Sequence, residues 1–470
     1  MYSSFQKTQA AVLNGELSCR EVVEYFLRNI EQKKHLNIFL EVYQQEALER
    51  AEAIDQKIAD GTQGRLAGMV LGIKDVLCYQ GHPLQAASQI LNGFEAQFTA
   101  TAVQRLLDED VIIIGRQNCD EFAMGSSNEN SSFGPTLNPV DETKVPGGSS
   151  GASAAAVAVG LCHASLGSDT GGSVRQPASF CGVVGLKPTY SRISRWGLIA
   201  YASSFDTIGI LSHTVEEAAL LLEVMAGQDE FDSTVSQREV PAYAQKLSLE
   251  RPLKVGYIKE TIESEGIDSE VKQKTLDRIE FLKQAGHEVK EVTFPLLEYV
   301  LPTYYILTTA EASTNLERYD GVKFGYRTPE ATDLETMYKR TRSEGFGAEV
   351  QRRIMLGTFV LSASYYDAYF TKAQKVRRLI AEQTKALFKE LDFLILPTAP
   401  TPPFEIGKYG EENLIEYYLA DLFTVQASVS GIPAISIPNG TSETGLPIGL
   451  QIMANAFNED KLLAFAKYLL

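Results

Sequence analysis

Three short segments of the chain carry residues that could perform acyl transfer. Lys74 follows the apolar run 67–73, and two glycine-rich turns each contain a candidate nucleophile, Ser149 in the first turn and Ser173 in the second. A lysine at the end of a buried strand loses solvation, which lowers the pKa of its ammonium group and favours the neutral amine. A neutral amine can act as a general base, and a serine hydroxyl can then attack a carbonyl carbon. These residue types predict acyl transfer without a histidine.

The second turn also contains a candidate oxyanion hole. Three small residues, Thr170, Gly171 and Gly172, stand directly before Ser173. Such a turn can direct several backbone N–H groups at one point, as a tetrahedral oxyanion requires. It could also hold a phosphate, but no Lys-Ser or Lys-Thr pair follows the glycines as it does in a P-loop.

The first turn permits a second interpretation, the nucleophile elbow of an α/β-hydrolase. Residues 147–151 read Gly-Gly-Ser-Ser-Gly, which matches G-x-S-x-G. An elbow follows directly on a strand, whereas the preceding residues 139–146 are polar and bounded by prolines. The elbow also requires a downstream acid and histidine, and only His213 and His287 follow His163. This alternative predicts that one of those histidines is essential.

Buried strands and one small-residue helix are expected to position these turns. Short apolar runs at 67–73 and 111–114 predict buried strands. The segment 145–173 contains seven glycines, six serines and six alanines among its 29 residues, a composition that a flexible linker could also have. The alanine-valine stretch 152–159 between the turns instead favours a tightly packed helix.

The rest of the chain alternates between helical and strand patterns, which predicts a mixed α/β fold with a central sheet. Capping boxes at Ser18–Glu21 and Thr214–Glu217 begin two of the predicted helices. The predicted helices lie around 22–30, 47–58, 102–107, 220–225, 270–285, 303–318 and 348–390, with one more at the C-terminus. Further strands are predicted at 253–258, 287–294, 393–396, 434–437 and 448–453.

Charge and composition limit the classes of partner. The 470 residues include 43 basic and 60 acidic side chains, a formal net charge of −17. Such a charge argues against a broad direct grip on nucleic acid or on an anionic membrane. The 44% of hydrophobic residues is ordinary for a folded globular protein.

Cysteine usage and hydropathy predict a soluble cytoplasmic protein. The five cysteines are scattered without C-x-x-C spacing, which is typical of reduced, buried thiols and predicts no metal site. The N-terminus lacks the charged and apolar regions of a signal peptide. No apolar run is long enough to span a membrane.

Three strings of the sequence resemble the amidase signature family. They are GIKD at 72–75, PGGSSGASAAAV at 146–157 and GSDTGGSVRQPA at 167–178. By this resemblance, the Ser–cis-Ser–Lys triad of the family maps onto Ser173, Ser149 and Lys74. The oxyanion would be held by the backbone of Thr170, Gly171 and Gly172.

The resemblance covers essentially the whole chain and implies a fold. It predicts a single large domain over 1–470, with a mixed sheet covered by helices on both faces. Residues 1–60 would form an N-terminal helical segment, and 67–200 would carry the signature motifs. Ala152 departs from the glycine usual in the family, but it lies off the reacting atoms.

Four further strings are similar to one branch of this family, the glutaminase subunits of tRNA-dependent amidotransferases. They are EFAMGS at 121–126, GLKPTY at 185–190, SRWGL at 194–198 and RRIMLG at 352–357. The likeness implies hydrolysis of glutamine through an acyl-enzyme on Ser173, with Lys74 accepting a proton relayed by Ser149. Released ammonia would convert Glu-tRNA(Gln) to Gln-tRNA(Gln), with Asp-tRNA(Asn) as a second candidate substrate.

The same likeness implies partners and substrate contacts. The B and C subunits of the amidotransferase would complete a heterotrimer in which a partner holds the tRNA and uses ATP and Mg, so this chain itself would need no cofactor. Arg353 would bind the carboxylate of glutamine, Asp421 its amino group, and Tyr304, or the adjacent Tyr305, would line the pocket. A free amino acid needs one cation and one anion, and arginine suits a carboxylate. Alternatives are a stand-alone amidase of small amides and a non-catalytic phosphate-binding scaffold.

Overall fold

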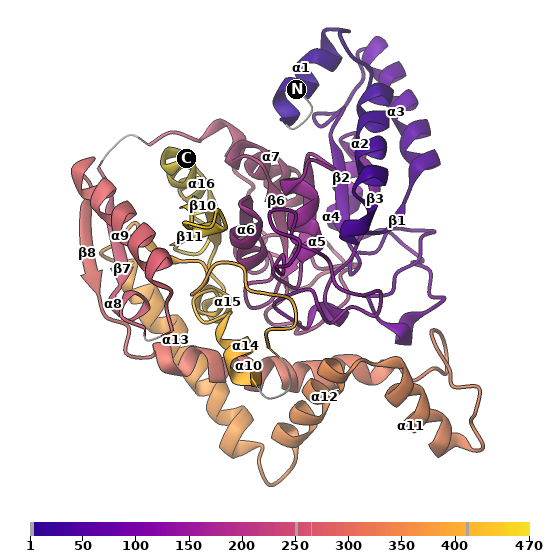
Figure 1. The fold of residues 1–470 in the computed structure, drawn as a ribbon, viewed down its shortest axis with the longest axis vertical. Coiled ribbons are helices and arrows are strands. Elements are labelled where there is room, and N and C mark those ends of the chain that lie inside the picture. Colours follow the sequence, from indigo (N-terminus) through magenta and orange to yellow (C-terminus); the bar gives the residue numbers. More distant parts are fainter. Residues whose placement is uncertain (1–3, 250–251, 265, 410–412) are drawn as a thin grey trace.

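One mixed β-sheet organises the described part of the chain, residues 4–249, 252–264, 266–409 and 413–470 of a computed structural model (Figure 1). Within these residues the sheet has eleven strands in the order β1-β3-β2-β4-β6-β5-β10-β11-β9-β7-β8. β2 is parallel to β3 and β4, and β7 is parallel to β8 and β9. The predicted mixed α/β fold is confirmed. The strands are β1 Phe39–Val42, β2 Val70–Lys74, β3 Ile112–Gln117, β4 Ala164–Asp169, β5 Val184–Lys187, β6 Thr207–Ser212, β7 Lys254–Ile258, β8 Glu288–Val292, β9 Phe393–Pro397, β10 Ala434–Thr441 and β11 Pro447–Ala454.

Helices cover both faces of the sheet. α4, α7, α9 and α16 pack on one face. The opposite face carries α2, α3 and α5 toward β1, α6 over β5, β10 and β11, and α10, α13 and α15 toward β9 (Figure 1). The helices are α1 Phe5–Leu13, α2 Cys19–Gln32, α3 Gln44–Ala59, α4 Thr101–Asp108, α5 Gly151–Ala158, α6 Arg175–Cys181, α7 Val215–Met225, α8 Lys259–Ile262, α9 Ser269–Gln284, α10 Leu297–Asn315, α11 Leu334–Gly345, α12 Ala348–Leu361, α13 Lys372–Leu387, α14 Leu414–Leu419, α15 Val425–Ser430 and α16 Glu459–Leu469.

Most predicted elements are present, with boundaries shifted by a few residues. The capping boxes at Ser18–Glu21 and Thr214–Glu217 begin α2 and α7, with both hydrogen bonds of each box formed. The helix predicted over 348–390 is interrupted: α12 ends at Leu361, and α13 begins at Lys372 after a π-helical turn.

Four strands were not predicted from the sequence: β1, β4, β5 and β6. The presence of β4 also changes where the second glycine-rich turn begins. β4 extends to Asp169, so the turn begins after that residue rather than at Gly167. Its sequence, Ala-Ser-Leu-Gly-Ser-Asp, has no β-branched residue, and burial on both faces removes any alternation. Small residues are required here, because a Cβ at Gly167 would lie 2.7 Å from Oγ of Ser150.

Cysteine burial agrees with the sequence prediction. All five cysteines are buried and none forms a disulfide. Across the described ranges, no helix has the length and apolar character needed to cross a bilayer. Residues 1–3 of the predicted N-terminal segment lie outside the described residues.

Candidate active site

Lys74 lies at the end of β2 and is fully buried among serine hydroxyls. Its Nζ is 2.6 Å from Oγ of Ser149 and 3.0 Å from Oγ of both Ser150 and Ser168. Burial lowers the pKa of Lys74 from 10.5 to about 8, although nearby acidic groups partly oppose this shift. The amine is therefore poised between its charged and neutral forms near physiological pH.

The hydrogen bonds of Ser150 indicate how a neutral Lys74 amine would be oriented. The Ser150 hydroxyl donates to the carbonyl oxygen of Ser168, so its oxygen accepts from Lys74. A neutral amine has two N–H donors and one lone pair. With the donors directed at Ser150 and Ser168, the lone pair is left for the hydroxyl proton of Ser149, which is the shortest of the three contacts.

The side chains of Asp120 and Gln176 fix the position of the loop that carries Ser149. The Gly148–Ser149 peptide bond is cis. The N–H of Gly148 donates to Oε1 of Gln176 at 3.0 Å. A Cβ at Gly148 would lie 2.1 Å from Oδ2 of Asp120, so only glycine fits against that buried carboxylate. Asp120 in turn accepts a backbone hydrogen bond from Asn128 at 2.9 Å, which fixes its position.

Ser173 is joined to this loop through the backbone. The N–H of Ser150 donates to the carbonyl oxygen of Ser173 at 3.1 Å. The side chain of Ser173 is largely buried, at 8% exposure, and its hydroxyl bonds to no other described residue. The structure therefore brings Lys74 and Ser149 into direct contact and places Ser173 beside them, without a hydrogen bond between the two candidate hydroxyls.

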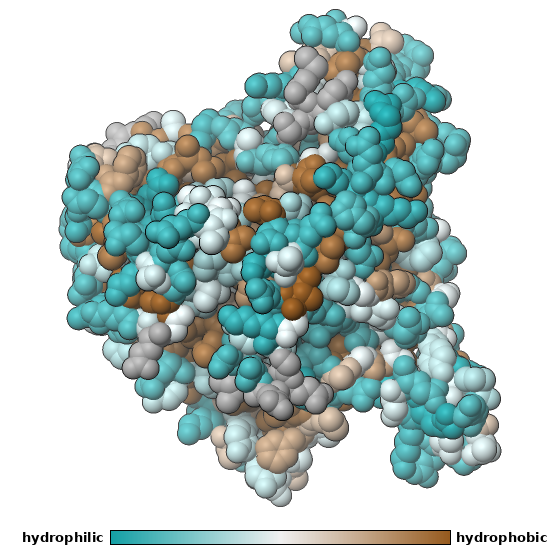
Figure 2. All heavy atoms as spheres, in the orientation of Figure 1, coloured by the Kyte–Doolittle hydropathy of each residue, from teal (hydrophilic) through white to brown (hydrophobic). Residues whose placement is uncertain are grey.

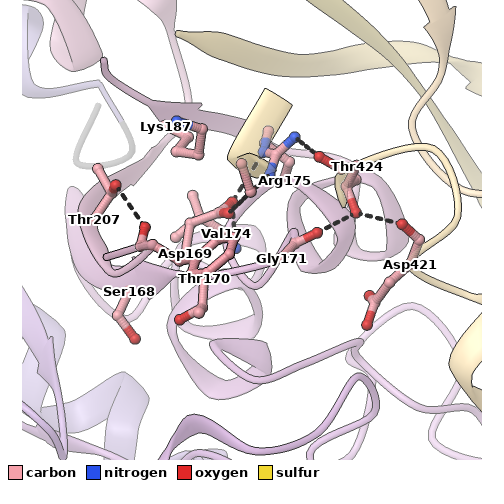
Figure 3. Close-up of polar contacts among 12 residues, drawn as sticks. Ser168, Asp169, Thr170, Gly171, Val174, Arg175, Lys187, Thr207, Asp421 and Thr424 are labelled. Atoms are coloured by element: carbon pink, nitrogen blue, oxygen red, sulfur yellow. Dashed lines mark hydrogen bonds and ion pairs between the residues drawn. The ribbon is translucent and has the colours of Figure 1, made fainter. Parts of the chain in front are cut away.

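The turn before Ser173 presents N–H groups that the protein itself does not use. Of the three residues predicted to hold the oxyanion, Thr170 donates its hydroxyl to Oδ1 of Asp206 at 2.7 Å. The N–H groups of Gly171, Gly172 and the following Ser173 donate to no other described residue. The Thr424 hydroxyl donates to the carbonyl oxygen of Gly171 at 2.6 Å, and Figure 3 shows Thr424 between Gly171 and Asp421. A Cβ at Gly172 would lie 2.1 Å from Oγ1 of Thr424, and the φ of Gly172 is +148°, so glycine is required there. Free N–H groups in a buried turn suit a developing oxyanion.

A buried ion pair that sequence reasoning missed anchors this turn. Nε and Nη2 of Arg175 donate to the two carboxylate oxygens of Asp169 at 2.9 and 2.8 Å (Figure 3). Burial alone would raise the pKa of Asp169, but the Arg175 guanidinium outweighs it and holds that pKa below its usual value. Arg175 also donates to the carbonyl oxygen of Thr424 at 2.7 Å, which ties both sides of the turn together. Asp169 and Arg175 both lie within the motif at 167–178, which is the sequence feature from which this ion pair could have been predicted.

Arg353, the residue predicted to bind a carboxylate, lies buried on α12. Two of its three side-chain nitrogens already donate hydrogen bonds within the protein. Nε donates to Oε1 of Glu349 at 2.8 Å, and Nη1 donates to the hydroxyl of Tyr201 at 2.9 Å. The rings of Tyr305 and Tyr418 lie 5.5 and 5.7 Å from its guanidinium carbon. Only Nη2 has no hydrogen-bond partner among the described residues, so the arginine offers one nitrogen and its charge rather than an open fork.

Asp421 is buried and hydrogen-bonded to the loop beside the catalytic candidates. Its Oδ2 accepts from the hydroxyl of Ser126 at 2.6 Å, and its carbonyl accepts from Oγ1 of Thr424 at 3.1 Å. Burial raises the pKa of Asp421 to about 7, with Arg353 opposing the rise. Arg353 and Asp421, the two charges predicted to bind glutamine, are therefore close enough to interact electrostatically.

The two tyrosines occupy different positions against this region. A Cβ at Gly171 would lie 2.5 Å from the hydroxyl of Tyr304, so that tyrosine packs directly on the turn. The hydroxyl of Tyr305 is buried and has no hydrogen-bond partner among the described residues. Both charges, Asp421 and Arg353, influence the Tyr305 hydroxyl. The same two charges act on the hydroxyl of Tyr304, which likewise has no hydrogen-bond partner among the described residues.

The α/β-hydrolase alternative is not supported by the structure. No strand precedes Ser149 in the described residues 139–146. The ring of His163 accepts the N–H of Val70 and packs on Phe26. His287 likewise accepts a backbone N–H. Among the described residues, neither histidine contacts Ser149 or Ser173, nor does His213, so no described histidine is placed as a base. The described residues also contain no group of three or more His, Cys, Asp or Glu side chains able to hold a metal ion.

Comparison with known families defines the class of protein. The sequence model of the family described as Amidase matches residues 21–463, which is nearly the whole chain. The chain therefore belongs to the amidase family, and the prediction from the three motif strings is confirmed.

Individual relatives narrow the similarity. The chain is 50% identical over 472 residues to the A subunit of the glutamyl-tRNA(Gln) amidotransferase of Chlorobaculum parvum, covering 100% of this chain and 98% of that protein. A crystal structure of the A subunit of the glutamyl-tRNA(Gln) amidotransferase from Thermotoga maritima is 38% identical, with a TM-score of 0.77 over 95% of this chain and 90% of that one. A structure reported on the evolutionary origins of an s-triazine catabolic enzyme is 30% identical, with a TM-score of 0.88 over 99% and 98% of the two chains.

Proposed function

We propose that the chain is the glutaminase subunit of a glutamyl-tRNA(Gln) amidotransferase, which hydrolyses glutamine and supplies ammonia to a partner subunit. The observation that carries the proposal is the buried Lys74 amine, 2.6 Å from the Ser149 hydroxyl and beside a turn with free N–H groups. The full-length similarity to the A subunits of such amidotransferases supports the choice of substrate.

The reaction begins with a proton transfer to Lys74. With its two N–H groups committed to Ser150 and Ser168, the neutral amine accepts the proton of the Ser149 hydroxyl. Ser149 then takes the proton of Ser173 as that oxygen attacks the side-chain carboxamide of glutamine. Burial supports this role, because it disfavours the charged amine that could not accept a proton.

The oxyanion and the leaving group complete the first half of the reaction. The carbonyl oxygen of the substrate becomes negative, and the N–H groups of Gly171, Gly172 and Ser173 are available to it. The carbon–nitrogen bond breaks as the proton held by Lys74 returns through Ser149 to the leaving nitrogen, which departs as ammonia. Water then attacks the acyl-enzyme under the same base and releases glutamate.

The predicted substrate residues suit a free amino acid. Asp421 provides an anion for the amino group, and Arg353 provides a cation and the free Nη2 for the carboxylate. The hydroxyls of Tyr304 and Tyr305, both without a hydrogen-bond partner among the described residues, offer further donors near these charges. Two opposite charges buried near each other suit a zwitterion better than a simple amide, which favours glutaminase activity over the alternative of a stand-alone amidase.

Replacing Arg353 with lysine is expected to raise the KM for glutamine by about 10- to 100-fold with a smaller change in kcat. Lysine keeps the charge but cannot bond Glu349, Tyr201 and a carboxylate from one rigid plane. Binding of a remote carboxylate stabilises ground and transition states alike, so its loss appears in KM. Steady-state kinetics measure the effect, with Arg378→Lys on the exposed face of α13 as the control. An unchanged KM would remove Arg353 from substrate binding.

An exposed aromatic surface supports docking of a partner subunit. Met355 on α12 is 66% exposed and Phe359 is 42% exposed, and Tyr365, Tyr366 and Tyr369 follow with 39–42% exposure. The ring centroids of Phe359, Tyr365 and Tyr369 lie 4.3–6.0 Å apart, so these three rings form one cluster. In Figure 2 the lower tip, where α12 leads into α13, is largely pale and tan rather than teal. Exposed patches of this kind mark interaction surfaces, and we assign this one to docking of the B or C partner of the heterotrimer.

The proposed division of labour leaves tRNA, ATP and Mg with the partner subunits in the cytoplasm. The net charge of −17 supports a chain that handles free glutamine rather than tRNA.

Purified chain is expected to release little glutamate from glutamine by itself and much more with the B and C subunits and Glu-tRNA(Gln). Coupled detection of glutamate measures both rates, with acetamide and propionamide as comparison substrates. Faster hydrolysis of those amides than of glutamine, unaffected by the other subunits, would establish the stand-alone amidase instead.

A further inference from the structure

A second polar cavity lies at the β1 edge of the sheet, away from the residues discussed so far. It has a volume of about 400 Å³ and is lined by apolar and charged side chains that include Leu40, Glu41, Phe94, Arg116 and Phe133. This volume is within the range of small-molecule sites. We call it the Arg116 cavity.

Arg116 is almost fully buried, at 2% exposure, yet most of its hydrogen-bonding capacity is unused. Nη1 donates to the carbonyl oxygen of Leu77 at 3.1 Å and reaches Asp75 only at 3.4 Å. Nε and Nη2 have no partner within hydrogen-bond distance among the described residues, and the hydroxyl of Tyr43, also unpaired, lies near the guanidinium. A buried cation with unpaired donors is costly, so a ligand that pairs them gains the corresponding free energy.

The unpaired nitrogens of Arg116, Nε and Nη2, are the same two with which Arg175 binds a carboxylate. In the pair with Asp169, Nε and Nη2 of Arg175 donate to the two oxygens of one carboxylate. The same two nitrogens of Arg116 are the ones left free. Asp75 cannot move to fill them without loss, because its oxygens accept the N–H groups of Gln85 and Ala87 at 3.2 and 2.8 Å.

Glu41 supplies an unpaired acceptor in the same cavity. It is the direct cross-strand neighbour of Arg116, since β1 and β3 are antiparallel with these residues in register. No ion pair joins the two side chains among the described residues, and Oε2 of Glu41 is buried without a hydrogen-bond partner there. A simple anion on Arg116 would therefore face a carboxylate, whereas a ligand with both charges would match the pair.

The Arg116 cavity is on the other side of the sheet from Lys74. A Cβ at Gly72 would lie 2.0 Å from Nε2 of Gln117, so Gln117 covers the face to which Gly72 and Lys74 belong. Successive residues of a strand point to opposite faces. Arg116 therefore points away from the catalytic candidates, and its cavity cannot be part of their pocket.

We propose that the Arg116 cavity binds a free α-amino acid, with its carboxylate on Nε and Nη2 of Arg116 and its ammonium group on Glu41. The apolar walls formed by Leu40, Phe94 and Phe133 would contact the side chain of the ligand. This site stands independently of the reaction proposed for Ser173.

Calorimetric titration of the full chain with L-glutamine tests the proposal. In a Ser173→Ala chain, which prevents turnover, two sites per chain are expected. Adding Asp421→Asn weakens the site at the catalytic turn and leaves the second site to be measured alone. In that background, Glu41→Gln is expected to weaken the remaining binding about 10- to 100-fold, because one charge-assisted pair is lost. Glu41→Gln is nearly isosteric and leaves the Arg116–Asp75 contact intact, and Glu49→Gln on α3 is the matched control.

Titrations with acetate and methylamine separate the contributions of the two charges. Weaker binding of either fragment than of glycine supports a site for both charges. One glutamine per chain, lost with Asp421→Asn and unchanged by Glu41→Gln, would overturn the proposal. Binding of acetate as tight as that of glycine and indifferent to Glu41→Gln would also overturn it, because the site would then recognise an anion alone.

Discussion

Replacing Ser173 with alanine is expected to reduce glutamine hydrolysis by about 10⁴-fold or more, because the acyl-enzyme can no longer form. The largely buried Ser173 hydroxyl bonds to no other described residue, so its loss leaves no orphaned partner and the fold should be unchanged. Release of glutamate and ammonia measures the effect. Circular dichroism and thermal unfolding of the same samples verify folding.

Ser153→Ala is the matched control for that substitution. Ser153 is a buried serine of the same motif, on α5, and its hydroxyl contacts only the carbonyl oxygen of Leu166 among the described residues, at 3.4 Å. It is expected to keep activity within about threefold of the parent chain, since surroundings away from the reacting atoms contribute little. Hydrolysis by Ser173→Ala within about tenfold of the parent would mean that another residue is the nucleophile.

Replacing Lys74 with methionine is expected to lower kcat/KM by about 10²- to 10⁴-fold, the usual contribution of a general base. Methionine is similar in volume and carries no amine. In the parent chain, kcat/KM is expected to rise with pH and level off above about 8, the pKa to which burial lowers Lys74. In Lys74→Met that rise should disappear. A parent-like rate, or a parent-like rise through pH 8 in the variant, would exclude Lys74 as the base.

Replacing Lys74 with methionine should also change how the free energy of unfolding depends on pH. The pKa of Lys74 is lowered in the folded chain from 10.5 to about 8, so between these values the unfolded chain binds the extra proton. Stability therefore rises with pH across this window and is flat on either side of it. The difference in unfolding free energy between the parent chain and Lys74→Met, measured by urea denaturation, should follow that course.

Sequence patterns predicted the elements whose apolar residues have a clear period, and failed where they do not. The capped helices α2 and α7 show both hydrogen bonds of the predicted boxes. β4 was hidden because it is built from small residues buried on both faces. Its small residues are needed for close contact with the serine loop, which no local pattern reveals.

The candidate site was predictable in its residue types and not in its contacts. Lys74, Ser149 and Ser173 stand in short motifs that can be read along the chain. The hydroxyl of Thr424 on Gly171 spans 253 residues of sequence, and that contact exists only in the folded chain. The free Nε/Nη2 edge of Arg116 could not be foreseen either, because it depends on which neighbours fail to reach it.

Acylation of Ser173 by glutamine can be observed by peptide-resolved mass spectrometry of the chain quenched in acid during turnover. We expect a peptide containing Ser173 with the added mass of a γ-glutamyl group. That adduct should be absent from Ser173→Ala and should diminish when hydroxylamine intercepts it as γ-glutamyl hydroxamate. Steady hydrolysis of glutamine with an unmodified Ser173 peptide, or with the adduct on another residue, would show that Ser173 is not the nucleophile.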